Sequence, residues 1–341
     1  MASIAINGLG RIGRAALKII EQADGAEVVA VNDLIPADNL AYLLRYDTVY
    51  GRWHTAVTAD GDALVVGGRK IPVLAMRDPA GLPWRDLSVD LVLECTGAFR
   101  REEDLKKHLN AGARRVILSA PARTETVATV VHGVNQAPPE EQVVSCASCT
   151  TNCITPVAEV LERRFGIRQA IMTTVHAYTS SQQLIDGPAR DFRRGRAGAA
   201  NMLPASTGAA LATTEALPAL AGRFDGVAIR VPIPVGSIAD VVAVTARSVT
   251  RDEVNGAFRD EAASDRYRGI LGVAEDPVVS ADIIGDPRAS VVDAALTRVV
   301  DRTLVKVMSW YDNEWGFACQ MIREAFSALG LPAPDLSQIQ P

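Results

Sequence analysis

The apolar positions in the first part of the chain follow two alternating patterns. Short apolar runs such as "SIAIN" (residues 3–7) and "AEVVAVND" (residues 26–33) have the length and β-branched content of buried strands. Between them, "RAALKIIEQ" repeats its apolar residues with the period of an amphipathic helix. Further strand-like runs follow at residues 70–75, 89–97 and 114–120, separated by helical or loop segments. Strands that alternate with helices predict a parallel, doubly wound α/β sheet.

The pattern changes after residue 148. Longer strand-like runs then occupy residues 169–179, 226–234, 238–249 and 303–315. Between the last two runs, Thr250 and Glu253 have the spacing of a capping box that opens a helix. This pattern favours an α+β domain on a mostly antiparallel sheet, followed by a last helix near residues 315–331 that packs back on the first domain.

The first strand and the first helix are joined by "GLGRIG", which contains Gly8, Gly10 and Gly13. Glycines in this position permit a tight turn and a close approach of the backbone to a pyrophosphate at the helix N-terminus. Asp33 follows about 20 residues later, where a carboxylate accepts hydrogen bonds from a ribose and repels a 2′-phosphate. The motif therefore predicts a Rossmann domain over residues 1–148 that binds NAD in preference to NADP. The change of pattern after residue 148 predicts a separate catalytic domain over residues 149–314.

Composition and charge exclude several other classes of protein. The chain has 341 residues, a length that allows two domains. Its 48% of hydrophobic and 22% of charged residues are typical of a globular protein. It has no apolar run long enough to cross a membrane, its start does not resemble a signal peptide, and its five cysteines are an odd number, so we expect a cytoplasmic protein without a disulfide framework. A net charge of -5 gives no support to nucleic-acid binding, whereas the basic run at residues 190–196 favours small anions.

The stretch "SCASCTTNCITPV" contains Cys146, Cys149 and Cys153 close together. A zinc site requires paired Cys or His ligands, and the histidines of the chain have no such spacing. Cys149 and Cys153 would lie on one helix face with Cβ atoms about 5–6 Å apart, against about 3.8 Å in a relaxed disulfide. We therefore expect no metal, only a strained disulfide if any, and Cys146 and Cys153 as small buried residues.

Cys149 differs because it begins the predicted helix, where the helix dipole favours a thiolate. Its best candidate partner is His176, which ends the strand "IMTTVH", because His54, His108 and His132 lie in polar or charged segments of the first domain. A cysteine nucleophile beside a nicotinamide indicates aldehyde oxidation. The thiolate adds to the aldehyde, and the hemithioacetal becomes a thioester when it gives up hydride.

Six motifs together resemble the phosphorylating glyceraldehyde-3-phosphate dehydrogenase family. They are "INGLGRIGR", "SCTTNC", "TTVHAYT", "RRGRAGAANMLPASTGAA", "IRVP" and "SWYDNEWG". The resemblance runs over essentially the whole chain and implies a homotetramer that uses NAD, glyceraldehyde 3-phosphate and inorganic phosphate. It also implies that Cys149 is the nucleophile and that His176 takes its proton and stabilises the oxyanion.

The resemblance assigns binding roles to further residues. For NAD it implies Arg11, Ile12, Asp33, Arg77, Ser119 and Asn313, with Thr96 and Gly97 in the same cleft. For the attacking phosphate it implies Ser148, Thr150, Thr207 and Gly208. For the substrate phosphate it implies Thr179 and Arg230, with Arg196 near both phosphates. Hydroxyls, a glycine amide and arginines are the groups that two phosphate sites need.

The sequence departs from the family pattern at three places. Ser181 stands where the family has an aspartate, "RVPIPVGS" (residues 230–237) replaces a commoner run, and Phe317 replaces an aromatic hydroxyl. Two other functions stay open at this point. Erythrose-4-phosphate dehydrogenase would share Cys149 and His176, and a dinucleotide-binding regulatory protein would have no turnover.

Overall fold

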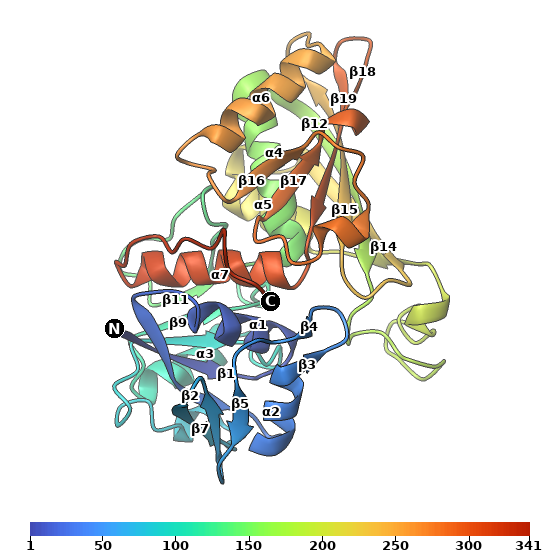
Figure 1. The fold of residues 1–341 in the computed structure, drawn as a ribbon. Helices are drawn as coiled ribbons and strands as arrows, with labels where there is room; N and C mark the ends of the chain where they lie inside the picture. The colour runs from blue at the N-terminus through green and yellow to red at the C-terminus, as the bar shows by residue number, and fades with distance from the viewer. The chain divides into compact units, whose positions relative to one another are not determined.

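The computed structural model describes all residues from Met1 to Pro341. The chain forms two compact units, each made of more than one segment (Figure 1). The N-terminal unit consists of Met1–His132, Gln136–Ala147 and Ala318–Pro341, and the C-terminal unit consists of Gly133–Asn135 and Ser148–Phe317. None of the helices has the length and apolar character needed to cross a bilayer.

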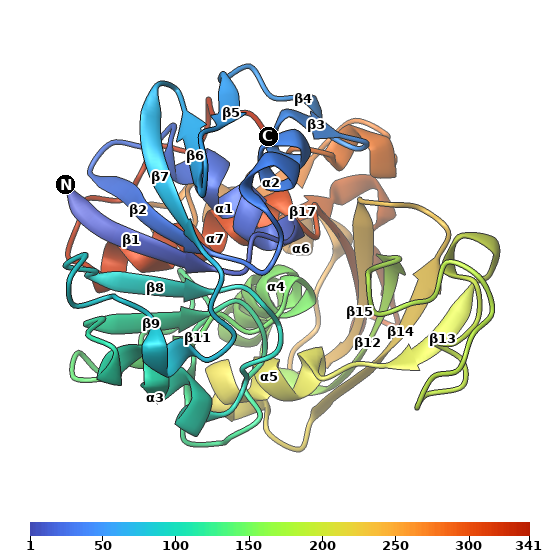
Figure 2. The ribbon, with the colours of Figure 1, turned by 90° about the horizontal axis from the view of Figure 1, so that it is seen from below.

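A nine-stranded sheet forms the centre of the N-terminal unit (Figure 2). In sheet order its strands are β10 (Ala128–Thr129), β11 (Val143–Ser145), β9 (Arg115–Leu118), β8 (Leu91–Glu94), β1 (Ala2–Asn7), β2 (Ala26–Asn32), β7 (Arg69–Leu74), β6 (Ala63–Val66) and β5 (Val57–Ala59). The strands from β10 to β7 are parallel, and only β6 and β5 pair antiparallel. The predicted parallel α/β sheet is therefore confirmed.

Four helices and a small hairpin complete the N-terminal unit. They are α1 (Arg11–Ile20), α2 (Ala37–Arg45), α3 (Glu102–Asn110), most of α7 (Trp315–Ala328), and the hairpin of β3 (Tyr46–Asp47) and β4 (Gly51–Arg52). Acidic residues fill the first turn of α3, where they complement the helix dipole. His132 Nδ1 lies 3.0 Å from Glu324 Oε2 on α7, which ties the end of the chain to the body of this unit.

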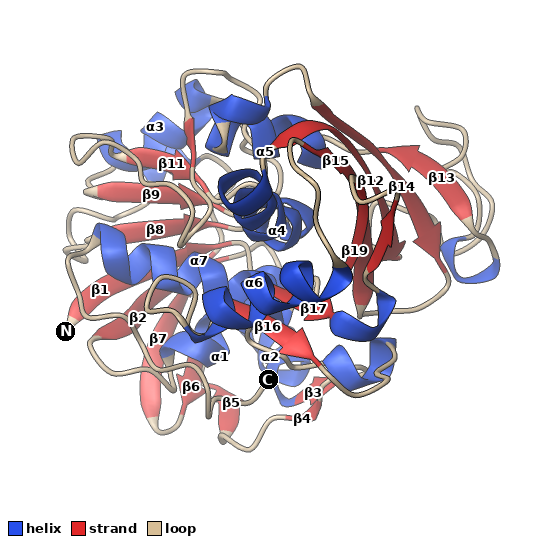
Figure 3. Ribbon diagram, turned by 90° about the horizontal axis from the view of Figure 1, so that it is seen from above, coloured by secondary structure: helices blue, strands red, loops and turns tan.

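The C-terminal unit is built on an eight-stranded sheet (Figure 3). In sheet order its strands are β13 (Leu203–Ser206), β14 (Phe224–Val231), β12 (Ile167–Ala177), β15 (Ser237–Thr245), β19 (Leu304–Tyr311), β17 (Ser290–Asp293) and β16 (Leu271–Ala274), with β18 (Arg298–Val300) paired to β19. Only the pairs β12–β14 and β16–β17 are parallel. The predicted α+β domain with a mostly antiparallel sheet is therefore confirmed.

One long helix, α4 (Cys149–Phe165), lies at the centre of the C-terminal unit. Ile154, Val157 and Leu161 of α4 are fully buried in the main core cluster. The other helices of this unit are α5 (Ala209–Ala216) and α6 (Arg251–Ala263). The predicted capping box of α6 is present, because Thr250 Oγ1 accepts from Glu253 N at 3.2 Å and Thr250 N donates to Glu253 Oε2 at 2.7 Å.

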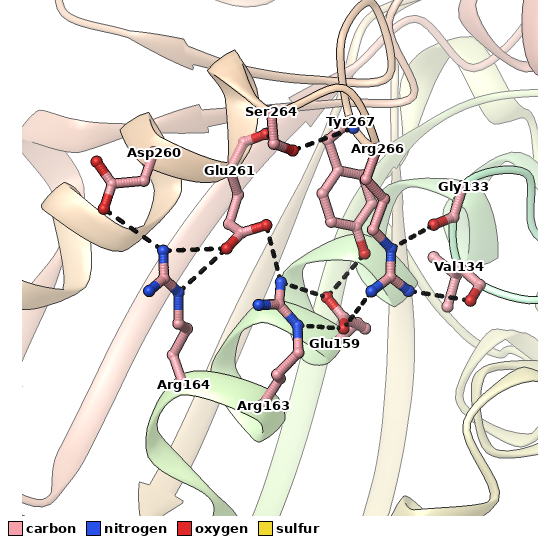
Figure 4. Close-up of polar contacts among 10 residues, drawn as sticks. All are labelled: Gly133, Val134, Glu159, Arg163, Arg164, Asp260, Glu261, Ser264, Arg266 and Tyr267. Atoms are coloured by element: carbon pink, nitrogen blue, oxygen red, sulfur yellow. Dashed lines mark hydrogen bonds and ion pairs between the residues drawn. The ribbon is translucent and has the colours of Figure 1, made fainter.

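The C-terminal end of α4 is fixed by a network of ion pairs (Figure 4). Arg163 contacts both Glu159, at 2.7 Å, and Glu261 of α6, at 2.8 Å. Arg266 contacts Glu159 at 2.9 Å and also donates to the carbonyl of Gly133 at 2.8 Å. A buried carboxylate with several hydrogen-bonded partners holds its helix in one position. The opposite end of α4, which begins with Cys149, is therefore part of a rigid element.

Candidate active site

The three glycines of the loop between β1 and α1 are required for different reasons. Gly8 has φ +93°, and a Cβ there would lie 2.7 Å from the backbone nitrogen of Thr96. A Cβ on Gly13 would lie 2.0 Å from the carbonyl oxygen of Gly8. A Cβ on Gly10 would meet nothing within 4 Å, and Gly10 precedes α1 without a side-chain cap. The open face of Gly10 and the uncapped helix end are what a pyrophosphate needs for close approach.

A cavity of about 430 Å³ lies beside this loop in the N-terminal unit. Five residues predicted from sequence line it, namely Gly8, Gly10, Asp33, Arg77 and Thr96. The cavity is also lined by residues that the sequence analysis did not name, among them Asn7, Asn32, Met76 and Cys95. Asn7 and Asn32 are the last residues of parallel neighbouring strands, so a polar residue at a strand end was the signal that could have found them.

Asp33 holds the glycine loop as well as facing the cavity. Its Oδ2 accepts a hydrogen bond from Leu9 N at 2.7 Å, and its Oδ1 accepts from Ile35 N at 3.1 Å. Arg11 is paired with Asp47 and lies 5.5 Å from the ring centroid of Tyr50. The Arg11 side chain is thus engaged within the unit, and its backbone begins α1.

The remaining predicted cofactor residues do not line this cavity. Ile12 and Gly13 lie in the first turn of α1, and Ser119 follows β9 and donates its backbone N–H to Glu94 O at 3.0 Å. Asn313 belongs to the C-terminal unit. There its Oδ1 accepts from Gly236 N at 3.1 Å and from Ser237 Oγ at 2.9 Å.

In the C-terminal unit, Cys149 is the first residue of α4. Ser148 caps the helix with its Oγ, which accepts from Thr151 N at 3.1 Å. The residue before the cap, Ala147, has φ +55°, a left-handed conformation that alanine rarely adopts. The strained turn and the cap place the thiol at the dipole end of the helix, as predicted from sequence.

Cys149 and His176 face each other, with Sγ 3.3 Å from Nε2. On the other side of the ring, Nδ1 lies 2.6 Å from the carbonyl oxygen of Ala177. A carbonyl oxygen can only accept, so this contact is a hydrogen bond when Nδ1 carries the ring hydrogen. In that tautomer Nε2 presents its lone pair to the thiol and can remove the proton of Cys149.

Arg230 lies beside His176 because the two residues are register partners in the parallel strands β12 and β14. Its Nη1 donates to the carbonyl oxygen of Ala177 at 3.0 Å and lies 2.9 Å from His176 Nδ1. Because a guanidinium can only donate, the contact with Nδ1 is a hydrogen bond only in the other tautomer, with the ring hydrogen on Nε2. Burial, together with the positive charges of Arg230 and Arg194, lowers the pKa of His176 to about 3. Burial also raises the pKa of the Cys149 thiol, against the opposing effect of Arg230. The free pair is therefore a neutral thiol and a neutral imidazole near pH 7.

Tyr311 was not predicted from sequence, yet it contacts the pair from a third side. Its ring meets the His176 ring edge-on, with centroids 5.9 Å apart. Its hydroxyl lies 2.9 Å from Thr150 Oγ1 and 2.8 Å from Thr174 Oγ1. Tyr311 lies on β19, far from His176 in the sequence, so no local sequence pattern indicates that the two rings meet.

Comparisons with known proteins decide the family. Residues 2–102 match the family model described as "Glyceraldehyde 3-phosphate dehydrogenase, NAD binding domain", and residues 148–313 match its "C-terminal domain". A glyceraldehyde-3-phosphate dehydrogenase of Kitasatospora aureofaciens is 51% identical over 326 residues, which is 94% of this chain and 97% of the relative. One of Geobacillus stearothermophilus is 48% identical over 322 residues, or 94% and 96% of the two chains. The chain belongs to the glyceraldehyde-3-phosphate dehydrogenase family.

Several residues that the family resemblance assigns to phosphates lie near the Cys149–His176 pair or at helix starts. Ser148 caps α4, and Thr150 bonds Tyr311. Thr207 accepts from Ala209 N at 3.1 Å, and Gly208 is the residue before α5. Hydroxyls and free N–H groups at two helix starts suit anions.

The structure distinguishes two arginines of the basic run that the sequence could not. Arg196 is 61% exposed in its side chain and pairs with Asp186 at 2.8 Å. Arg194 instead contributes to the fields at His176 and Arg230. Its Nη1 donates to Ser181 Oγ at 3.1 Å, and Ser181 Oγ lies 2.8 Å from Thr179 Oγ1. At the family's acidic position Arg194 therefore meets a neutral hydroxyl, and its ion pair is instead with Asp191, at 3.5 Å.

The other departures from the family pattern have clear structural places. In the run at residues 230–237, Ser237 Oγ accepts from Ala177 N at 3.1 Å and donates to Asn313 Oδ1. Phe317 is buried on α7. None of the five cysteines forms a disulfide, and no three His, Cys, Asp or Glu side chains of the chain are placed to hold a metal. Cys153 is buried, with Sγ 3.7 Å from Ser290 Oγ, which fits a packing role.

Proposed function

We propose that this protein catalyses the NAD-dependent oxidative phosphorylation of glyceraldehyde 3-phosphate to 1,3-bisphosphoglycerate. The observation that carries the proposal is the contact of 3.3 Å between Cys149 Sγ and His176 Nε2 at the start of α4. Family membership and the similarity to curated dehydrogenases support the same activity.

The reaction begins at the thiol. His176 Nε2 removes the proton of Cys149, and the thiolate adds to the aldehyde carbon to give a hemithioacetal. The imidazolium that results carries hydrogens on both nitrogens: Nδ1–H bonds the Ala177 carbonyl, and Nε2–H stabilises the new oxyanion and then passes to it to form the hemithioacetal hydroxyl. An anionic substrate near Arg230 and Arg194 offsets their positive charge, and this favours protonation of His176.

The second half of the reaction regenerates the thiol. His176 takes the hydroxyl proton of the hemithioacetal as its carbon loses hydride, leaving a thioester on Cys149. Inorganic phosphate then attacks the thioester carbon, the sulfur leaves as thiolate, and the His176 imidazolium returns its proton to the sulfur, which restores the thiol. Ser148, Thr150, Thr207 and Gly208 supply the donors that hold this phosphate, while Thr179 and Arg230 hold the phosphate of the substrate, with Arg194 or Arg196 near both.

The N-terminal unit provides the cofactor site in this proposal. NAD, when bound, supplies the acceptor for the hydride. The open face of Gly10 receives the pyrophosphate, Asp33 accepts from the ribose hydroxyls, and Arg77 and Thr96 line the same cavity. Arg11, Ile12 and Ser119 complete this set, together with Asn313 from the C-terminal unit.

A turnover experiment without phosphate tests the proposal. With aldehyde and NAD alone we expect a burst of about one NADH per active site followed by slow turnover, because phosphate orientation is what accelerates thioester cleavage. Adding phosphate should restore steady turnover and yield an acyl phosphate. Fast steady turnover in phosphate-free buffer would indicate a hydrolytic aldehyde dehydrogenase instead. The ratio of kcat/KM on glyceraldehyde 3-phosphate and erythrose 4-phosphate separates the two sugar-phosphate activities.

We also propose a homotetramer and a cytoplasmic location. The outward face of the sheet in the C-terminal unit carries exposed apolar side chains at Ile171 and Val227 on the neighbouring strands β12 and β14. Exposed apolar patches on a sheet are typical of surfaces covered by a partner, here a second copy of the chain. Sedimentation equilibrium of the wild type and of Val227→Asp measures this assembly, which the substitution should weaken.

A further inference from the structure

A chain of buried polar side chains in the N-terminal unit has no role in the mechanism above. Glu94, at the end of β8, and His108, on α3, are both completely buried. His108 Nε2 lies 3.2 Å from Glu94 Oε2, and His108 Nδ1 lies 2.9 Å from Trp84 Nε1. Buried groups of this kind are costly unless every hydrogen bond is made.

Trp84 determines the state of the histidine. An indole N–H can only donate, so His108 Nδ1 must accept. The remaining ring hydrogen is therefore on Nε2 and points at Glu94. His108 connects an obligate donor to a carboxylate, and a ring with hydrogens on both nitrogens would lose the tryptophan bond.

The Glu94 carboxylate is bound entirely by neutral donors in the contacts that the structure gives it. Asn7 Nδ2 lies 2.5 Å from Oε2, Thr96 N donates to Oε1 at 2.8 Å, and Thr96 Oγ1 also contacts Oε1. With His108, these donors occupy both oxygens. Each donor is thereby held in a fixed orientation.

The chain continues from Glu94 to the cavity beside the glycine loop. Asn7 Oδ1 accepts from Asn32 Nδ2 at 2.7 Å. Asn32 makes two hydrogen bonds with the backbone of Met76, each of 2.9 Å: its Nδ2 donates to Met76 O, and its Oδ1 accepts from Met76 N. Asn7, Asn32, Met76 and Thr96 all line the cavity, whereas His108 and Trp84 do not.

We propose that His108 is a positioning residue for the dinucleotide cavity, acting through Glu94 on Asn7 and Thr96. The hydrogen bond from His108 fixes the carboxylate, and the carboxylate fixes the donors that form the cavity wall. The cofactor then binds a wall that is already ordered, which increases affinity. This inference rests on the proposed binding of NAD, and it is independent of the aldehyde chemistry.

A pair of substitutions separates this role from simple packing. His108→Leu keeps apolar bulk but removes both hydrogen bonds. His108→Gln can still accept from Trp84 through its carbonyl and donate to Glu94 through its amide. Titration calorimetry with NAD should show about a tenfold weaker Kd for His108→Leu, since two buried partners are left unpaired, and recovery to within about threefold for His108→Gln. The exposed His54→Leu in the same unit is the matched control and should not change Kd.

Kinetics provide the readout that a merely structural role would not give. His108→Leu should raise KM for NAD in parallel with Kd, while kcat at saturating NAD and the alkylation rate of Cys149 stay within about twofold of wild type. If His108→Leu does not fold, Glu94→Gln tests the same chain. Its amide hydrogens would face donors on Asn7 or His108, and NAD binding should weaken similarly.

The outcomes have distinct meanings. Wild-type NAD affinity in folded His108→Leu or Glu94→Gln would overturn the inference, as would a His108→Gln variant no better than His108→Leu. Failure of the wild type to bind NAD would instead refute the proposed function. Loss of phosphate-dependent turnover with NAD affinity intact would leave the inference standing and remove only the aldehyde chemistry.

Discussion

The two buried histidines with assigned roles, one in each unit, have opposite surroundings. His108 donates to a carboxylate and accepts from an indole, so both ring nitrogens have strong partners. His176 Nδ1 faces the carbonyl oxygen of Ala177 and Nη1 of Arg230, and its other nitrogen faces only the Cys149 thiol. Both rings are almost inaccessible to solvent.

The difference shows how the same side chain can position a site or react in it. His108 accepts from an indole, which has no proton to transfer near neutral pH, so in our proposals this ring only holds its neighbours. His176 is buried beside the cation Arg230 and faces a weakly acidic thiol, so its protonation responds when a nearby charge changes. Burial alone does not separate the two proposed roles; the partners of each ring do.

The largest effect on kcat should come from replacing His176. His176→Asn retains a donor for Ala177 but removes the base, so kcat should fall about 10²–10⁴-fold. NAD affinity, measured by calorimetry, should stay at the wild-type value. His108→Gln is the reciprocal control and should retain kcat. A His176→Asn enzyme within tenfold of wild-type kcat would show that another group removes the proton.

A smaller effect concerns stability and pH. The pKa of His176 is lowered to about 3, so the ring stays neutral in the folded protein down to about that pH. In the unfolded chain the same ring takes up a proton below about pH 6.5. The stability that the neutral ring contributes is complete above pH 6.5 and falls as the pH drops toward 3. Between pH 7.5 and 5 the wild type should lose about 2 kcal/mol of unfolding free energy relative to His176→Asn.

Urea unfolding of the two proteins at both pH values measures this difference directly. Titrations elsewhere in the chain affect both proteins alike and cancel. A difference that does not change with pH would mean that the ring is protonated in the folded state despite its burial.

The smallest effect compares the two arginines near the site. Arg194→Leu removes a positive charge that our proposal places near the substrate phosphate, so kcat/KM for the phosphorylated aldehyde should fall about tenfold. Arg196→Leu removes an exposed ion pair with Asp186 and should change kcat/KM less than twofold. Unphosphorylated glyceraldehyde, assayed in parallel, should be affected little by either change. The reverse order of the two variants would favour Arg196 over Arg194 as the phosphate ligand.

The sequence sufficed where local chemistry determines the structure. The glycine loop, the capping box at Thr250 and the position of Cys149 at a helix start all depend on residues a few positions apart. The two sheet classes followed from the spacing of apolar runs. His176 could be chosen over the other histidines because it ends a long strand in the same domain as the cysteine.

Contacts made across the sheets could not be derived in this way. Tyr311 reaches His176 from the distant strand β19, and Glu94 meets Asn7 and His108 only because β8 pairs with β1 and α3 packs nearby. The sequence placed His108 on a charged helix without indicating that the ring is buried. The sequence gives no reason to distinguish Arg194 from Arg196, and their surroundings differ only because of the path of the loop in three dimensions.

The division of the chain into segments has a consequence for synthesis. The N-terminal unit includes Ala318–Pro341, and all of Ser148–Phe317 belongs to the other unit. At usual translation speeds roughly 10–30 s pass between the emergence of Ala147 and that of Ala318. During this interval the partly built first unit lacks its closing helix, while the C-terminal unit can already assemble around α4. The part of the protein that is translated first is thus the last to be finished, and during translation it is the half that most needs protection from aggregation.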